Sequence, residues 1–287
     1  MRREQTLLYA WCPILIWEVA GSGHLDSVAM AYISLALLFR YRRRPVATGI
    51  FLGLAVMTKL YPIVLLPALM MRKNPSARPA AESRDLGSLL RGWDWTMPAT
   101  VFALIAVGYA AYSSVGMLVF GFLGGYVKEE GLQTGARYFL LELAQEIPGL
   151  HGLPTGVFYL LCVATFAVLT VWALKVAMEQ GSGASFLRPA FALATALMLL
   201  FSPHYAWYIL WLVPFFALLP NLPVLTYLVA FFYLYTTELA DPGPKMFLLN
   251  KYLYAVVLGA VIIQAVLRRW PVHRAYMVQP RAGSEVL

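Results

Sequence analysis

The stretch EVAGSGHLDSVAM, residues 18–30, places three ionisable side chains in an otherwise apolar part of the chain: Glu18, His24 and Asp26. Ionisable groups at or within a membrane are costly to desolvate, so they are functional candidates by default. Two glycines permit a tight turn here, and Asp26 would make a good N-cap for a following helix. Capping alone could explain Asp26. It leaves His24 and Glu18 unexplained, and three titratable groups at one boundary favour a polar site.

A second candidate is Lys59, in the sequence MTKLYP. A lysine near a membrane surface often extends its charged end into water, which would explain this residue without a site. The alternative is that Lys59 binds a lipid phosphate, because an ammonium is a compact cation suited to that group.

A third candidate is the sequence SPHYAWYILWLVP, residues 202–214, which contains His204, Tyr205 and Tyr208. Its tryptophans are typical of the aromatic belt that anchors membrane proteins at the lipid–water interface. Aromatic rings also stack on sugars and isoprenoid chains, and an imidazole can donate to a phosphate or a hydroxyl. Both interpretations stay open from the sequence.

The composition of the whole chain indicates a membrane protein. Of its 287 residues, 61% are hydrophobic and 13% are charged, about half the charged fraction usual in soluble domains. The net charge of +8 is not accompanied by a soluble basic module, so we expect no nucleic-acid partner. The two cysteines have neither disulfide-framework nor zinc-site spacing.

The apolar runs predict an all-α, polytopic helix bundle with about ten segments, several of them short or half-spanning. We expect no cleaved signal peptide, because no small-residue cleavage site follows the first run. The expected segments are 6–20, 26–41, 46–57, 62–71, 95–115, 155–176, 189–201, 205–219, 222–236 and 247–267.

The two segments at 46–57 and 62–71 form either one long span or a hairpin of half-helices with Lys59 near its tip. The positive-inside rule favours the hairpin, because that topology places most of the 22 Lys and Arg residues on one side. Both termini and a loop at 72–94 are then cytoplasmic, whereas the three candidate stretches face outside. We expect one transmembrane domain, residues 1–287, in the plasma (inner) membrane.

The longest outer connection, at 116–154, contains an expected interfacial amphipathic helix at 137–147. This helix either covers the bundle or forms the wall of a substrate groove. On a helical wheel its apolar face holds Phe139, Leu140, Leu143 and Ile147, and its polar face holds Tyr138, Glu142, Gln145 and Glu146.

Together these motifs resemble polytopic glycosyltransferases of the GT-C class. The resemblance is to polyprenyl-phosphate-mannose-dependent mannosyltransferases and the related glycosyltransferase family 87. It is carried by residues 11–70, from WCPILIWEVAGSGHLDSVAM to AVMTKLYPIVLLPALM, and by residues 202–214, whereas 120–147 is similar only in style. Trp11, Cys12 and Pro13 stand where the family often has Asn-Pro.

The resemblance implies transfer of a hexose, with mannose favoured, from a polyprenyl phosphate to a lipid- or protein-linked acceptor on the outer face. In such chemistry a carboxylate deprotonates the acceptor hydroxyl and cations stabilise the departing phosphate. The implied roles are Asp26 as the catalytic base, Lys59, His204 and Arg137 for the donor phosphate, and His24, Glu18, Tyr205 and Tyr208 for sugar or acceptor. No metal ligands are assigned, and the need for a divalent metal is open.

The base of such enzymes usually lies in a first outer loop that follows an N-terminal helix. This chain begins at what resembles a later helix, so we expect a truncated sequence. The alternatives are that Asp26 has taken the role of the base, or that the chain is not active alone.

Two other classes of function stay open. Short, broken helices are typical of transporters and lipid flippases, although we see no internal repeat and the charges gather at one boundary. The chain could also be a non-catalytic membrane subunit. In every case its expected partners include membrane lipids.

Overall fold

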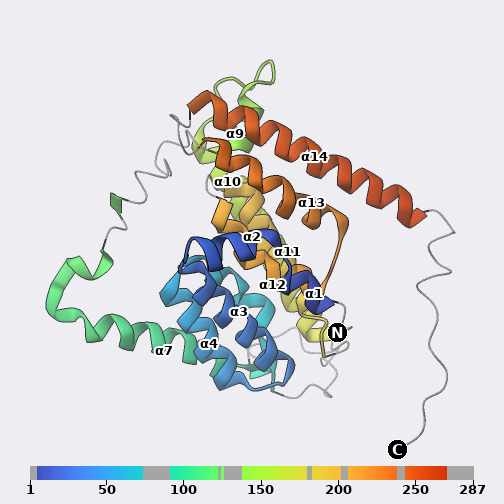
Figure 1. Ribbon diagram of the computed structural model, residues 1–287. Helices are drawn as coiled ribbons and strands as arrows, with labels where there is room; N and C mark the ends of the chain where they lie inside the picture. The colour runs from blue at the N-terminus through green and yellow to red at the C-terminus, as the bar shows by residue number, and fades with distance from the viewer. Residues whose placement is uncertain are drawn as a thin grey trace, which may run out of the picture. The chain divides into compact units, whose positions relative to one another are not determined.

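The computed structural model describes residues 5–73, 91–121, 124–125, 138–179, 183–201, 206–237 and 243–269. These residues are almost entirely helical, as Figure 1 shows, which confirms the all-α prediction. The chain forms two compact units, Met1–Leu219 and Pro220–Leu287, each described here by itself.

The first unit combines α-helices with shorter turns of 3₁₀ or π-helix. Its elements are α1 (Gln5–Ala10), α2 (Pro13–Leu15), η1 (Ile16–Gly21), α3 (Asp26–Tyr41), α4 (Pro45–Thr58), η2 (Tyr61–Leu65), α5 (Leu66–Leu69), β1 (Met71–Arg72), β2 (Trp93–Asp94), α7 (Thr96–Ala111), η3 (Ser113–Phe120), α9 (Phe139–Gln145), α10 (Thr155–Glu179), α11 (Leu187–Phe201), η4 (Ala206–Leu212) and α12 (Val213–Leu218). The strands β1 and β2 pair antiparallel.

The second unit contains α13 (Leu222–Ala230), η5 (Phe231–Thr237) and α14 (Gly243–Arg269). Asn221 caps α13, because its side-chain oxygen accepts from the Val224 amide at 3.0 Å. The Leu222 amide donates to the side chain of Gln264 at 2.9 Å, which fixes the start of α13 against α14.

Two helices of the described residues are long and apolar enough to cross a membrane: Thr155–Met178 and Phe247–Arg268. A third span is possible if α7 and η3 act as one, although they are bent by 105°. The prediction of about ten segments is therefore not confirmed, because several expected spans are short helices or are interrupted by 3₁₀ turns. Segment 6–20, for example, is divided among α1, α2 and η1.

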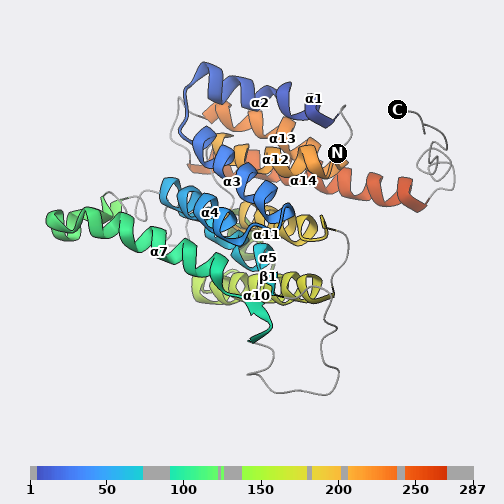
Figure 2. The same cartoon turned by 90° about the horizontal axis from the view of Figure 1, so that it is seen from below.

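The helices α3, α4 and α7 lie side by side, as the two views in Figures 1 and 2 show. A turn at Arg42–Arg44 reverses the chain after α3, and α4 then packs along α3. Pro45 begins α4 at a position where its missing N–H costs no helical hydrogen bond.

The chain leaves α4 at Lys59, whose backbone is extended, and a 3₁₀ turn begins at Tyr61. Pro62 contributes to this break, because it has no N–H to donate to the Thr58 carbonyl and so cannot continue the α-helical hydrogen bonds of α4. The chain then returns to the C-terminal end of α3, where Arg40 Nη2 donates to the Met70 carbonyl at 2.9 Å. The segments expected at 46–57 and 62–71 therefore do not form one long helix; they are separated by a break at Lys59.

Close packing of α4 on α7 depends on two glycines, Gly49 and Gly53. A Cβ atom on Gly49 would lie 2.6 Å from the Met97 carbonyl oxygen and 2.7 Å from Thr100 Cβ. A Cβ atom on Gly53 would lie 2.9 Å from a methyl of Leu104. Small residues spaced four apart allow helix backbones to approach in this way.

We expect the variant G49L to lower the free energy of unfolding by about 1–3 kcal/mol, because the added side chain must push α7 away. The matched control is G156A in α10, where an added Cβ atom meets nothing within 4 Å. Thermal unfolding in detergent measures both. A melting temperature for G49L equal to that of the wild type would contradict the close contact.

The helix α9 confirms a helix within the expected segment 137–147, and part of its predicted polar face is buried. Tyr138, assigned to the polar face, is buried with Leu141 against Phe158 of α10. Of the predicted apolar face, Phe139 is buried, whereas Leu143 and Ile147 are exposed. Packing against α10 determines which side is buried, and the helical wheel does not contain that information.

Candidate functional site

The antiparallel pairing of α3 and α4 brings the first residue of α3 next to the residue that follows α4. The 16 residues of α3 extend for about 24 Å, so the arginines of the turn lie far from Asp26. Returning along α3, α4 delivers Lys59 to the end where Asp26 lies. Two candidates separated by more than thirty positions in the sequence thus meet.

Asp26 and Lys59 form an ion pair, with 3.3 Å between Asp26 Oδ2 and Lys59 Nζ. The Asp26 side chain is only 3% exposed, whereas that of Lys59 is 29% exposed. The Tyr61 hydroxyl donates to Asp26 Oδ1 at 3.5 Å, a long hydrogen bond. The buried carboxylate therefore orients an ammonium that stays accessible.

The expected capping role of Asp26 is wrong. Leu25 is the N-cap of α3, and no side chain caps that helix. Asp26 is its first helical residue, where a negative charge is favourable toward the helix dipole. Its oxygens are instead directed at Lys59 and Tyr61, a tertiary interaction that the local sequence does not reveal.

Glu18 and His24 form a second close polar pair, with 3.0 Å between Glu18 Oε2 and His24 Nε2. Glu18 lies in η1, a π-helical turn, and its side chain is 1% exposed. π-Helical turns occur frequently at functional sites. The deeply buried Glu18 carboxylate is therefore placed to orient the His24 ring.

The backbone around His24 is fixed by hydrogen bonds. Its amide donates to the Glu18 carbonyl at 3.0 Å, and its carbonyl accepts from the Ser27 hydroxyl at 2.9 Å. Gly23 has a φ of 69°, a left-handed conformation that favours glycine. The imidazole, 30% exposed, is thus held with Nε2 toward Glu18.

The element η4 contacts both the Glu18–His24 pair and the Asp26–Lys59 pair. The Trp207 ring stacks on His24 with 4.4 Å between ring centroids, and Lys59 Nζ lies 5.6 Å from the centroid of Tyr208. Trp207 and Tyr208 are themselves neighbours, at 6.1 Å. Glu18, His24, Asp26, Lys59 and Tyr208, all candidates from the sequence, therefore belong to one cluster.

Sequence reasoning did not assign roles to Tyr61, Trp207 or Trp211. Trp211 is 1% exposed, contacts Tyr61 at 4.5 Å between ring centroids, and donates from Nε1 to Met198 Sδ. It is a core residue, so the aromatic-belt interpretation does not apply to it. The sequence did not distinguish Trp211 from Trp207, because both stand in the same aromatic run.

Three assigned residues, Arg137, His204 and Tyr205, lie outside the described residues. Their roles stay predictions. Within the part of the chain that the structure describes, no three His, Cys, Asp or Glu side chains gather as a metal site.

Two helices of the described residues are long and apolar enough to cross a membrane. One end of the α3–α4 hairpin holds an accessible ammonium, an oriented imidazole and stacked aromatic rings. The chain belongs to glycosyltransferase family 87, whose family model matches residues 3–203. This match includes Glu18, His24, Asp26, Lys59 and the whole α3–α4 hairpin, but it ends before Trp207 and Tyr208 of η4. No curated protein and no solved structure matches the chain significantly. The family makes the protein a membrane glycosyltransferase.

Proposed function

We propose that the protein transfers a hexose, with mannose favoured, from a polyprenyl phosphate to a lipid- or protein-linked acceptor on the outer face. The observation that carries this proposal is the Asp26–Lys59 pair, in which a buried carboxylate directs a part-exposed ammonium. A cation held in this way suits a phosphate that acquires charge as it departs.

In the proposed reaction the bond between sugar C1 and the phosphate oxygen breaks, and the electron pair leaves with polyprenyl phosphate. A bond forms between C1 and the acceptor hydroxyl oxygen, and the hydroxyl proton passes to a base. Lys59 stabilises the leaving phosphate, with Arg137 and His204 as further cations in the proposal. His24 binds sugar or acceptor through the imidazole atoms that do not face Glu18, with Tyr208 and Tyr205 beside it.

Asp26 has two possible roles in this scheme. As the base, its carboxylate would accept the hydroxyl proton directly. Its burial and its pairing with Lys59 favour the other role, in which Asp26 holds the ammonium toward the phosphate. We propose this positioning role, and the base role is the alternative that a kinetic test separates.

The experiment is a transfer assay with the protein in liposomes. The donor is either polyprenyl-phosphate mannose or GDP-mannose, each labelled in the mannose. We expect labelled product only from the lipid-linked donor, together with release of unlabelled polyprenyl phosphate. Product from GDP-mannose alone would contradict the proposed donor. Movement of the lipid-linked sugar across the bilayer without product would instead support a flippase.

A further inference from the structure

The other end of the α3–α4 hairpin contains a buried cation. Arg40, in the last turn of α3, is 5% exposed. Its Nη2 donates to the Met70 carbonyl at 2.9 Å, and its guanidinium lies 4.9 Å from the centroid of the Phe186 ring. Among the described residues, Nε of this guanidinium has no hydrogen-bond partner, and no carboxylate pairs with it.

A buried guanidinium without a counterion is costly, by several kcal/mol in a dry interior. The contacts of Arg40 with a carbonyl and a ring offset only part of this cost, because neither partner carries a negative charge. A bound anion would offset the rest of this cost, and the described residues do not supply one.

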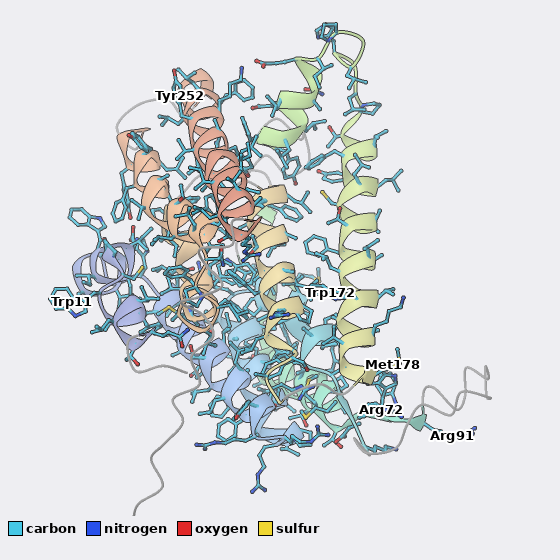
Figure 3. The ribbon with its side chains drawn as sticks, turned by 90° about the vertical axis from the view of Figure 1, so that its right-hand side faces the viewer. Trp11, Arg72, Arg91, Trp172, Met178 and Tyr252 are labelled. Atoms are coloured by element: carbon cyan, nitrogen blue, oxygen red, sulfur yellow. The ribbon has the colours of Figure 1, made fainter. Side chains whose placement is uncertain are left out.

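More cations surround Arg40 on the same end of the unit. Arg42, Arg43 and Arg44 are exposed, and Arg43 Nη2 donates to the Arg72 carbonyl at 3.2 Å. Figure 3 shows Arg72 and Arg91 at the same end of the structure as Met178, near the end of α10. Like charges gathered in this way attract an anion.

Exposed apolar and aromatic side chains lie beside these cations. Leu38 is 39% exposed, Tyr41 is 57% exposed and Trp95 is 48% exposed. A basic group flanked by such side chains is typical of the membrane interface, where aromatic rings lie among headgroups. These exposed apolar side chains favour a lipid phosphate, whose acyl chains they would contact, over a dissolved phosphate.

We propose that this end of the hairpin binds the phosphate of an anionic glycerophospholipid, with Arg40 and Arg43 as its principal ligands. The site is separate from the Asp26–Lys59 cluster and does not depend on the proposed transfer reaction. It places the lipid at the leaflet that carries anionic headgroups and attracts basic segments.

The test titrates the full-length protein in detergent micelles with phosphatidylglycerol, phosphatidylcholine or inorganic phosphate and follows thermal unfolding. We expect phosphatidylglycerol to raise the melting temperature at concentrations at which the other two do not. The variant R43G removes one cation and places glycine at a residue with a φ of 54°, so folding is retained. We expect it to weaken the apparent affinity for phosphatidylglycerol about fivefold, from ~1 kcal/mol per basic residue.

The control is K175Q, which removes an exposed cation on α10, outside the α3–α4 hairpin. We expect it to bind phosphatidylglycerol as the wild type does. Equal losses in R43G and K175Q would mean diffuse attraction and would overturn the site. Equal stabilisation by phosphatidylcholine or by inorganic phosphate would overturn the proposed ligand.

Discussion

The variant K59M is expected to lower the turnover of sugar transfer by about 10²–10³-fold, the usual cost of removing one group that stabilises a developing negative charge. Methionine keeps most of the side-chain volume but removes the ammonium that Asp26 directs. Initial rates with a polyprenyl-phosphate donor measure the effect. Turnover of K59M near that of the wild type would contradict the proposed role of Lys59.

Two controls separate this effect from loss of folding. K59M leaves the buried Asp26 carboxylate without its cation, which is itself destabilising. The double variant K59M/D26N removes both charges, so it should unfold near the wild-type temperature and still fail to transfer sugar. K59R keeps a cation and should retain part of the activity, although its fork-shaped group differs from an ammonium.

The variant D26N is expected to raise the Michaelis constant for the donor and to lower turnover about 10–10²-fold, because Asn no longer attracts the ammonium. Loss of an interaction made in both ground and transition states appears in the Michaelis constant, whereas loss of a base appears in turnover alone. Steady-state kinetics over a range of donor concentrations make this distinction.

A different outcome for D26N would assign the base role to Asp26. In that case turnover falls by about 10²–10⁴-fold at an unchanged Michaelis constant, in line with loss of a general base. The turnover of the double variant K59M/D26N distinguishes the two roles of Asp26 independently. If Asp26 acts through Lys59, the double variant should be no slower than K59M. If Asp26 is a separate base, the fold-losses in turnover of K59M and D26N should multiply in the double variant.

The sequence was sufficient for features that depend on local pattern. Continuous apolar runs predicted the helices at 26–41 and 155–176 nearly to the residue, and Pro62 indicated the break after Lys59. The charge asymmetry then placed Glu18, His24, Asp26 and Lys59 on one side. That placement is enough to propose a site, but not to say which side chains touch.

Features that depend on tertiary partners could not be predicted. The capping role assigned to Asp26 is wrong because Lys59 and Tyr61, remote in the sequence, compete for its oxygens. The buried face of α9 is set by α10 rather than by its own period. Trp207 seemed typical of a membrane anchor, yet it stacks on His24.

The number of spans was also beyond local pattern. A run of apolar residues has similar hydropathy whether it forms one straight helix or a helix followed by a 3₁₀ turn. Prolines at the starts of η2, α12 and α13 contribute to these interruptions. The bend of 105° between α7 and η3 falls at Tyr112, where no proline or glycine indicates it.

The central claim, that Lys59 holds the donor phosphate, is tested most directly by binding rather than by catalysis. Polyprenyl phosphate and the matching polyprenol differ only in the phosphate, so their affinities for wild-type protein and for K59M isolate its recognition. We predict that the wild type binds the phosphate at least about tenfold more tightly, the worth of one charge-assisted contact, and that K59M loses this preference. Equal binding of the two lipids by the wild type, or an undiminished preference in K59M, would contradict the account.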